Sequence, residues 1–277
     1  MSALGPGALC VSNIAWHPDE EAGVARALAA IGVRQIEIAP LRAVPVPWEP
    51  DTEKAKAYRA FWASHGIAVY AMQALLFGRD GLGIFGDAAA RALTFDHLSG
   101  VLGLAELLGV KRLVFGSPLQ RLRGERADVE LVEIAVDFFS RLGEVAVQHG
   151  AQVCIEPNPP QYGCTWVTTA VEGAHIVRAV AHPGFGLHLD AAGMYLAGDR
   201  LPDAVQQGAD QLGHVHFSAP QLGHVDRAGP VDYAALVAAL RAAQYEGAVS
   251  IEMRAQAPGR NLAAVLESTA LLQQLLM

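Results

Sequence analysis

Short apolar runs alternate with longer segments of helical spacing along the whole chain. Each run is bounded by turn-forming residues and is typical of a strand that is buried in a sheet. The runs predict eight strands, at residues 8–12, 34–38, 67–73, 110–115, 151–156, 184–190, 212–217 and 247–252.

The segments between these runs carry apolar residues at the spacing of an amphipathic helix. In residues 125–149, for example, Val129, Val132 and Val136 fall on one face, and Gly150 follows at the expected C-cap. The pattern predicts helices at residues 19–31, 52–65, 87–108, 125–149, 168–181, 199–208, 231–244 and 260–276.

Eight strands that are each followed by a helix imply parallel pairing with right-handed crossovers. Such a regular count closes naturally into a single (β/α)8 barrel, the TIM-barrel class of α/β fold, and 277 residues fit one such domain. The first strand is not followed by Gly-x-Gly-x-x-Gly, which weighs against a dinucleotide-binding fold. With no linker or break in composition, residues 1–277 are predicted to form one domain.

Composition narrows the class of protein further. Apolar residues make up 52% of the chain and charged residues 17%, which favours a globular enzyme. The net charge of −8 opposes binding to nucleic acid, and no apolar run is long enough to predict a membrane span. The start of the chain does not resemble a signal peptide. Three cysteines without a framework of spacings indicate reduced thiols, so a cytoplasmic location is expected.

Four strands in the second half of the chain end on residues that can bind a divalent cation. Burying a charge costs several kcal/mol unless it is paired or metal-bound, and the carboxyl ends of barrel strands form the active-site rim. Carboxylates with an imidazole form an oxygen-rich donor set that suits Mn²⁺, Mg²⁺ or Co²⁺ better than structural zinc. The four residues are Glu156, Asp190, His216 and Glu252.

Simpler interpretations exist for each residue alone. A single acid at a strand end is more often a surface carboxylate or a helix cap, and His188 and His214 are as easily explained as core histidines. Four suitable residues at four successive strand ends are improbable by chance. His216 is preferred to His214 as the ligand because it lies nearer the end of its strand.

The same strand ends resemble the xylose isomerase-like superfamily, and more closely its sugar phosphate isomerase/epimerase group, which includes the ketose 3-epimerases. The resemblance implies a TIM barrel and one divalent metal, most often Mn²⁺, with Mg²⁺, Co²⁺ or Zn²⁺ as alternatives. It assigns the metal to Glu156, Asp190, His216 and Glu252. The stretches that carry it are Ile155-Glu156-Pro157-Asn158-Pro159, His188-Leu189-Asp190, Gly213-His214-Val215-His216 and Ser250-Ile251-Glu252.

The resemblance also implies a reaction. It predicts a sugar, sugar-phosphate or keto-polyol isomerase or epimerase in which Glu156 and Glu252 act as acid and base through an enediolate. A small carbohydrate is the expected partner, and a homo-dimer or tetramer the expected assembly. Ketose 3-epimerases carry a His, a Glu and an Arg where this chain has Gly193, Tyr162 and Leu222. A different substrate, or dehydration of a sugar or inosose, is therefore also considered.

Further residues near the strand ends are predicted to contact substrate. Asn158 and His188 share strand faces with metal ligands, although either could instead orient a carboxylate. Arg254 could bind an anionic group, and an aromatic ring after a strand could stack on a sugar, with exposure or core packing as the alternatives. The predicted substrate-binding residues are Asn158, His188, Arg254, Gln73, Trp16 and Trp166.

Two functions of other classes remain. An AP endonuclease-like DNA repair enzyme shares the fold and several ligands, but Gly193 and Asp226-Arg227-Ala228 replace its further zinc ligands, and the net charge is −8. A non-catalytic sugar-binding barrel is the second, and the complete donor set argues against it.

Overall fold

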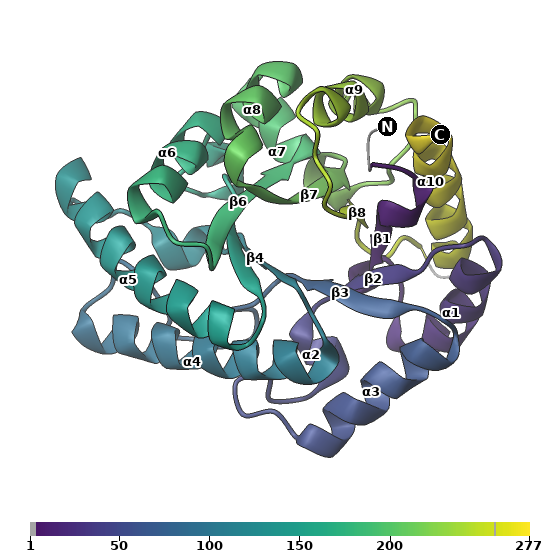
Figure 1. Ribbon diagram of the computed structural model, residues 1–277, viewed down its shortest axis with the longest axis horizontal. Coiled ribbons are helices and arrows are strands. Elements are labelled where there is room, and N and C mark those ends of the chain that lie inside the picture. Colours follow the sequence, from purple (N-terminus) through teal and green to yellow (C-terminus); the bar gives the residue numbers. More distant parts are fainter. Residues whose placement is uncertain (1–3, 258) are drawn as a thin grey trace.

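The eight strands pair in sequence order into a closed, all-parallel barrel in the computed structural model, which describes residues 4–257 and 259–277 (Figure 1). Pairing of Val11 with Ile251 closes the ring between the first and last strands. The predicted fold class is confirmed. The strands are β1 (Leu9–Ser12), β2 (Gln35–Ile38), β3 (Ala68–Met72), β4 (Arg112–Phe115), β5 (Gln152–Ile155), β6 (Phe185–Asp190), β7 (Leu212–Ser218) and β8 (Val249–Glu252).

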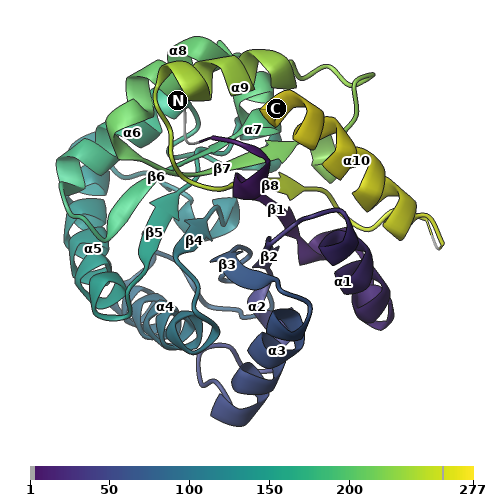
Figure 2. The same ribbon diagram turned by 45° about the vertical axis from the view of Figure 1, so that its right-hand side comes forward.

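Helices form an outer ring around the barrel (Figure 2). All eight predicted helices are present, and their ends lie within three residues of the predicted bounds. They are α1 (Glu21–Ala30), α3 (Thr52–Ser64), α4 (Ala88–Leu108), α5 (Asp128–Gln148), α6 (Ala170–Val180), α8 (Leu201–Gly208), α9 (Tyr233–Ala242) and α10 (Asn261–Leu276). None of the described helices combines the length and apolar character needed to cross a membrane.

Two short helices, α2 (Pro40–Ala43) and α7 (Ala191–Ala197), were not predicted. The start of α7 has no separate capping residue, because Asp190 ends β6 and is also the N-cap of the helix. Its carboxylate accepts a hydrogen bond of 2.5 Å from the main-chain N–H of Gly193. One residue therefore ends a strand, begins a helix and has its side chain fixed at the rim of the barrel.

A β-bulge in β7 shapes the interior. The pairing of β6 with β7 shifts between Leu187 and His188, so that Gly213 is an extra residue in the ladder. A Cβ atom at Gly213 would collide with the side chains of Gln152 and Cys154, so a larger residue there would force both side chains to move. Beyond the bulge, β7 presents its histidines to the barrel interior in register with β6.

The apolar core lies mainly between the strands and the helices. Phe139 of α5 stacks on Phe185 of β6 at 4.4 Å between ring centroids, and Phe115 of β4 packs edge-on against Phe139. The three cysteines are free and buried. By contrast, the interior of the barrel toward the carboxyl ends of the strands holds buried Glu, Asp, Ser and His side chains. This polar layer marks the functional end of the barrel.

Candidate metal centre and active site

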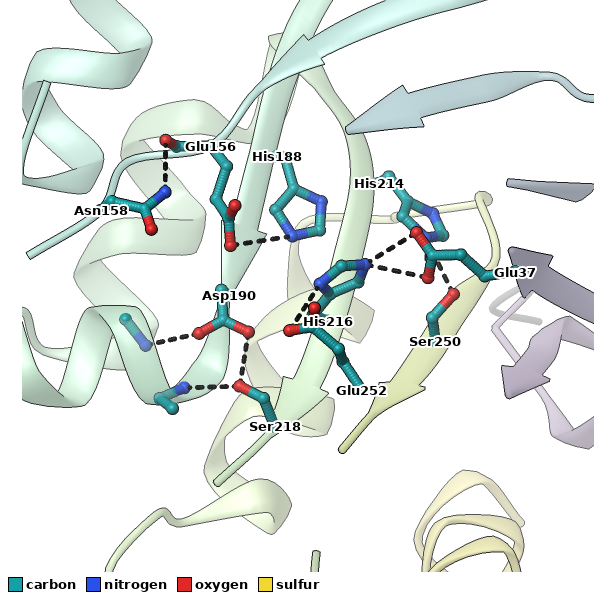
Figure 3. Close-up of polar contacts among 12 residues, drawn as sticks. Glu37, Glu156, Asn158, His188, Asp190, His214, His216, Ser218, Ser250 and Glu252 are labelled. Atoms are coloured by element: carbon teal, nitrogen blue, oxygen red, sulfur yellow. Dashed lines mark hydrogen bonds and ion pairs between the residues drawn. The ribbon is translucent and has the colours of Figure 1, made fainter. Parts of the chain in front are cut away.

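The four predicted ligands gather around one space at the carboxyl ends of β5, β6, β7 and β8 (Figure 3). Ligand atoms of Asp190, His216 and Glu252 lie within 4.8 Å of one another, as do those of Glu156, His188 and His216. His216 Nδ1 lies 3.2 Å from Glu252 Oε2. The strand order brings these residues to one rim of the barrel.

His216 is held by a carboxylate on the opposite side of the ring. Its Nε2 lies 3.0 Å and 2.9 Å from the two carboxylate oxygens of Glu37, a fully buried residue of β2. Burial alone would lower the pKa of His216, but Glu37 and Glu252 outweigh it and raise that pKa well above its usual range. This contact fixes the imidazole with Nδ1 directed at the shared space.

Asp190 is positioned by hydrogen bonds to both of its oxygens. Gly193 N–H donates to one oxygen, and the hydroxyl of Ser218 donates to the other. Ser218 Oγ in turn accepts from the main-chain N–H of Ala192 at 3.0 Å. Burial and then the charge of Glu252 raise the pKa of Asp190 to about 6.

Glu156 follows β5, and its carboxylate lies against Gly116 in the loop after β4. A Cβ atom at Gly116 would collide with Glu156 Oε2, so this carboxylate position requires glycine. The buried guanidinium of Arg121 donates to the main-chain oxygen of Glu156 at 2.6 Å, and the Asn158 amide donates to the same oxygen at 3.1 Å. Burial, followed by the charges of Asp190 and Glu252, raises the pKa of Glu156 to about 8.

These carboxylates border a cavity of about 370 Å³ at the mouth of the barrel. Glu156, Asp190 and Glu252 all line it, so a ligand in the cavity would contact the donor set directly. None of the described lining residues is basic. The other polar lining residues are Gln73, Ser117, Asn158, Tyr162, Ser218 and Gln221.

The predicted substrate-binding residues divide between this cavity and other places. Gln73 and Asn158 line the cavity. Trp16 is fully buried in the core, with its ring centroid 6.2 Å from that of Trp62. Trp166 lines a separate groove beside α5 and α6, where it packs edge-on against Phe85 at 4.8 Å.

The remaining two predictions also fall outside the cavity lining. His188 is fully buried beneath the cavity, because it lies two residues before the end of β6. Arg254 is exposed just beyond β8, and its main-chain N–H donates to the oxygen of Leu222. Position after a strand places a residue near the rim but does not decide which way its side chain turns.

Three functional positions were missed or only partly recognised from the sequence. Ser218 lies two residues after His216 on the same strand face, so strand alternation could have found it. Glu37 lies inside a predicted strand, but no pattern in the sequence indicates its partner across the barrel. Arg121 carries no sequence signal, because the carbonyl oxygens that it binds belong to a distant loop.

The electrostatics of the site fit a divalent cation. Glu156, Asp190 and Glu252 line one cavity beside the imidazoles of His188 and His216, and the mutual repulsion of the carboxylates contributes to the raised pKa values of Glu156 and Asp190. A cation among these oxygens would offset both the repulsion and the burial of charge. The donors are the hard oxygens and the imidazole that Mn²⁺, Mg²⁺, Co²⁺ and Zn²⁺ accept.

The metal-free protein is expected to lose stability as the pH rises from about 6.5 to about 8. Over this window folded Glu156 and His216 keep protons that the unfolded chain releases, so a higher pH favours unfolding. His188 and His214, whose pKa values burial lowers, are neutral in both states above about 6.5 and do not oppose the trend.

Thermal unfolding with a chelator present measures this dependence. Glu156→Gln removes one of the two groups and should make the fall in melting temperature shallower. A melting temperature that rises with pH over the same window would contradict the assignment.

Comparisons with known proteins identify the family of this barrel. A sequence profile of the xylose isomerase-like TIM barrel family matches residues 25–275. The L-ribulose 3-epimerase of Methylomonas sp. (strain DH-1) is 30% identical over 152 residues, which are 54% of this chain and 50% of that protein. The match thus spans about half the length of this curated relative.

Solved structures share the whole barrel at low identity. The D-psicose 3-epimerase of Clostridium cellulolyticum H10, solved with D-tagatose, has a TM-score of 0.78 at 18% identity, covering 97% of this chain and 98% of that one. The IOLI protein with a bound zinc atom has a TM-score of 0.76 at 18% identity, covering 97% of each chain. At such identity the likeness establishes the fold, and the family follows from the profile. Because the profile spans nearly the whole barrel, the chain belongs to the xylose isomerase-like TIM barrel family.

Proposed function

We propose that this chain is a divalent-metal-dependent isomerase or epimerase of a small carbohydrate. One observation carries the proposal: Glu156 and Glu252, at the ends of β5 and β8, line one cavity together with Asp190, and His216 lies within 4.8 Å of the Asp190 and Glu252 donor atoms. The match to an L-ribulose 3-epimerase supports the same class of reaction.

The residues that would hold the cation are Glu156, Asp190, His216 and Glu252. Mn²⁺ is proposed because the oxygen-rich donor set suits a hard cation and the family resemblance implies this metal. When bound, such a cation supplies Lewis-acid polarisation of a substrate carbonyl.

The two glutamates would move the proton. One carboxylate removes a proton from the carbon next to the carbonyl, which gives an enediolate, and the other glutamate returns a proton from its own side. Both glutamates line the cavity, so either carboxyl group can reach a substrate bound there as general acid or base. Asn158 and Gln73, which line the cavity, are placed to bind hydroxyl groups.

Solvent deuterium uptake tests this function. The protein would be incubated with Mn²⁺ in D₂O and a panel of ketoses, aldoses and keto-inositols, and the products examined by NMR and mass spectrometry. Deuterium on a carbon next to the carbonyl of one substrate class is expected, and a chelator should stop it. A product that has lost water would instead indicate a dehydratase. A metal-loaded protein that exchanges no proton in any compound would reject proton-transfer chemistry on these substrates.

Glu37→Gln is expected to weaken metal binding by about 10–100-fold without removing a ligand. The carboxylate that orients His216 loses its charge, and the imidazole becomes a poorer donor. Competition with a chromophoric chelator measures the affinity. Ser250→Ala is the matched control, because Ser250 bonds His214 in the same layer but does not contact His216 through any described hydrogen bond. Equal affinities for wild type and Glu37→Gln would show that Glu37 does not position the ligand.

A further inference from the structure

His188 is a buried imidazole that the proposed function leaves without a role. It lies in β6 two residues before Asp190, has no exposed surface and does not line the cavity. Neither of its ring nitrogens has a hydrogen-bond partner among the described residues. A polar side chain buried in this way is unfavourable unless something else binds it, so the unpartnered ring itself points to a ligand.

The ring faces the metal centre. Its Nε2 lies 4.0 Å from Glu156 Oε1, and its centroid lies 4.1 Å from that of His216. In Figure 3 this nitrogen points into the space that Glu156, Asp190 and His216 surround. A separation of 4.0 Å is too long for a hydrogen bond, so direct bonding to Glu156 does not explain the orientation.

We propose that His188 is a fifth protein donor to the divalent cation, through Nε2; this rests on the proposed function. The donor spacing supports it. A metal–ligand bond to nitrogen or oxygen is about 2.1 Å, so two donors on opposite sides of one ion are about 4.2 Å apart and adjacent donors about 3.0 Å apart. The distances of 4.0 Å from His188 Nε2 to Glu156 Oε1 and 3.2 Å from His216 Nδ1 to Glu252 Oε2 both lie within this span, and donor atoms of Glu156, His188 and His216 lie within 4.8 Å of one another.

A metal binds the neutral form of an imidazole, and coordination through Nε2 would satisfy one of the two unpartnered ring nitrogens of His188.

A second imidazole ligand would change which divalent cations the centre binds most tightly. Three carboxylates with two imidazoles favour Zn²⁺ and Co²⁺ over Mg²⁺ more strongly than three carboxylates with one. Five protein donors also leave one position of a six-coordinate ion, where four leave two. Metal preference is therefore a property that distinguishes the two arrangements without any measurement of turnover.

Counting imidazoles on a bound metal tests the assignment. The probe is Cu²⁺ loaded into the full-length protein, with pulsed EPR to count the coordinated imidazoles. Wild type is expected to show two, His188→Gln one, and the matched control His214→Gln two, since the Nε2 of His214 bonds Ser250 instead. Competition titrations should show that His188→Gln weakens Zn²⁺ binding by more than about 10-fold and Mg²⁺ binding by a smaller factor.

The outcomes separate cleanly. One imidazole in wild type, or two in His188→Gln, overturns the fifth donor and leaves the proposed function intact. Equal losses of Zn²⁺ and Mg²⁺ affinity would also overturn it, because a merely structural change does not discriminate between metals. A wild-type protein that binds no divalent cation defeats the proposed function itself. If His188→Gln does not fold, the wild-type count together with His214→Gln still decides the question.

Discussion

Replacing Glu156 or Glu252 with Gln is expected to lower turnover by about 10²–10⁴-fold, the range that a positioned acid or base contributes. Each substitution keeps the size of the side chain and removes the group that carries the proton. Deuterium uptake and product formation under Mn²⁺ saturation would be measured for both variants. The loss should persist at saturating metal, because a weaker metal affinity alone would be overcome there.

The control is Glu133→Gln, which changes an exposed acid on α5 far from the cavity and should leave turnover unchanged. Circular dichroism and thermal unfolding would verify that all three variants fold. If Glu156→Gln or Glu252→Gln turned over within a few-fold of wild type at saturating Mn²⁺, that glutamate would not be the acid or base.

Asp190→Ala is expected to reduce the metal content of the purified protein from about one ion per chain to none. The substitution removes one donor and also the acceptor that caps α7. Metal content would be measured by inductively coupled plasma mass spectrometry after dialysis against Mn²⁺. Retention of a full equivalent of metal in this variant would show that the cation lies elsewhere.

Asp190→Asn separates the two roles of this residue. Its amide oxygen can still accept from Gly193 N–H, so the Asn variant should be more stable than the Ala variant by about 0.5–2 kcal/mol, the usual contribution of an N-cap. Both variants should nevertheless lose the metal, because an amide is a weaker donor than a carboxylate. Comparing their denaturant midpoints measures the contribution of the side-chain hydrogen bonds of residue 190, the cap to Gly193 and the contact with Ser218.

The barrel could be predicted because the apolar spacing of its strands and helices and the glycines between them indicate the same element boundaries. Gly109 and Gly150 sit where a helix gives way to a strand and adopt the left-handed φ values of 81° and 67° that glycine favours. The helix α7 escaped prediction for the opposite reason. Asp190 belongs to the strand pattern and to the helix cap at once, so no separate signal marks where one element ends and the next begins.

The predicted ligands lie together because parallel strands in sequence order bring their carboxyl ends to one rim. Contacts between strands on opposite sides of the barrel cannot be predicted from strand order alone. Whether Glu37 meets His214, His216 or neither depends on strand tilt and on the bulge at Gly213, which no local pattern encodes. The side-chain directions of Trp16 and Arg254 depend likewise on tertiary packing, and these two predictions found no support at the cavity.

The contact between Glu37 and His216 joins residues 179 positions apart, on strands that belong to different halves of the barrel. All four predicted ligands lie in the C-terminal half, whereas the carboxylate that orients one of them comes from the N-terminal half. A folding intermediate with only the later strands assembled would hold the donors but leave His216 free to rotate. Tight cation binding would then arise late, once the non-local pairing that closes the ring is complete. The rate at which affinity appears during refolding would therefore report the closure of the barrel.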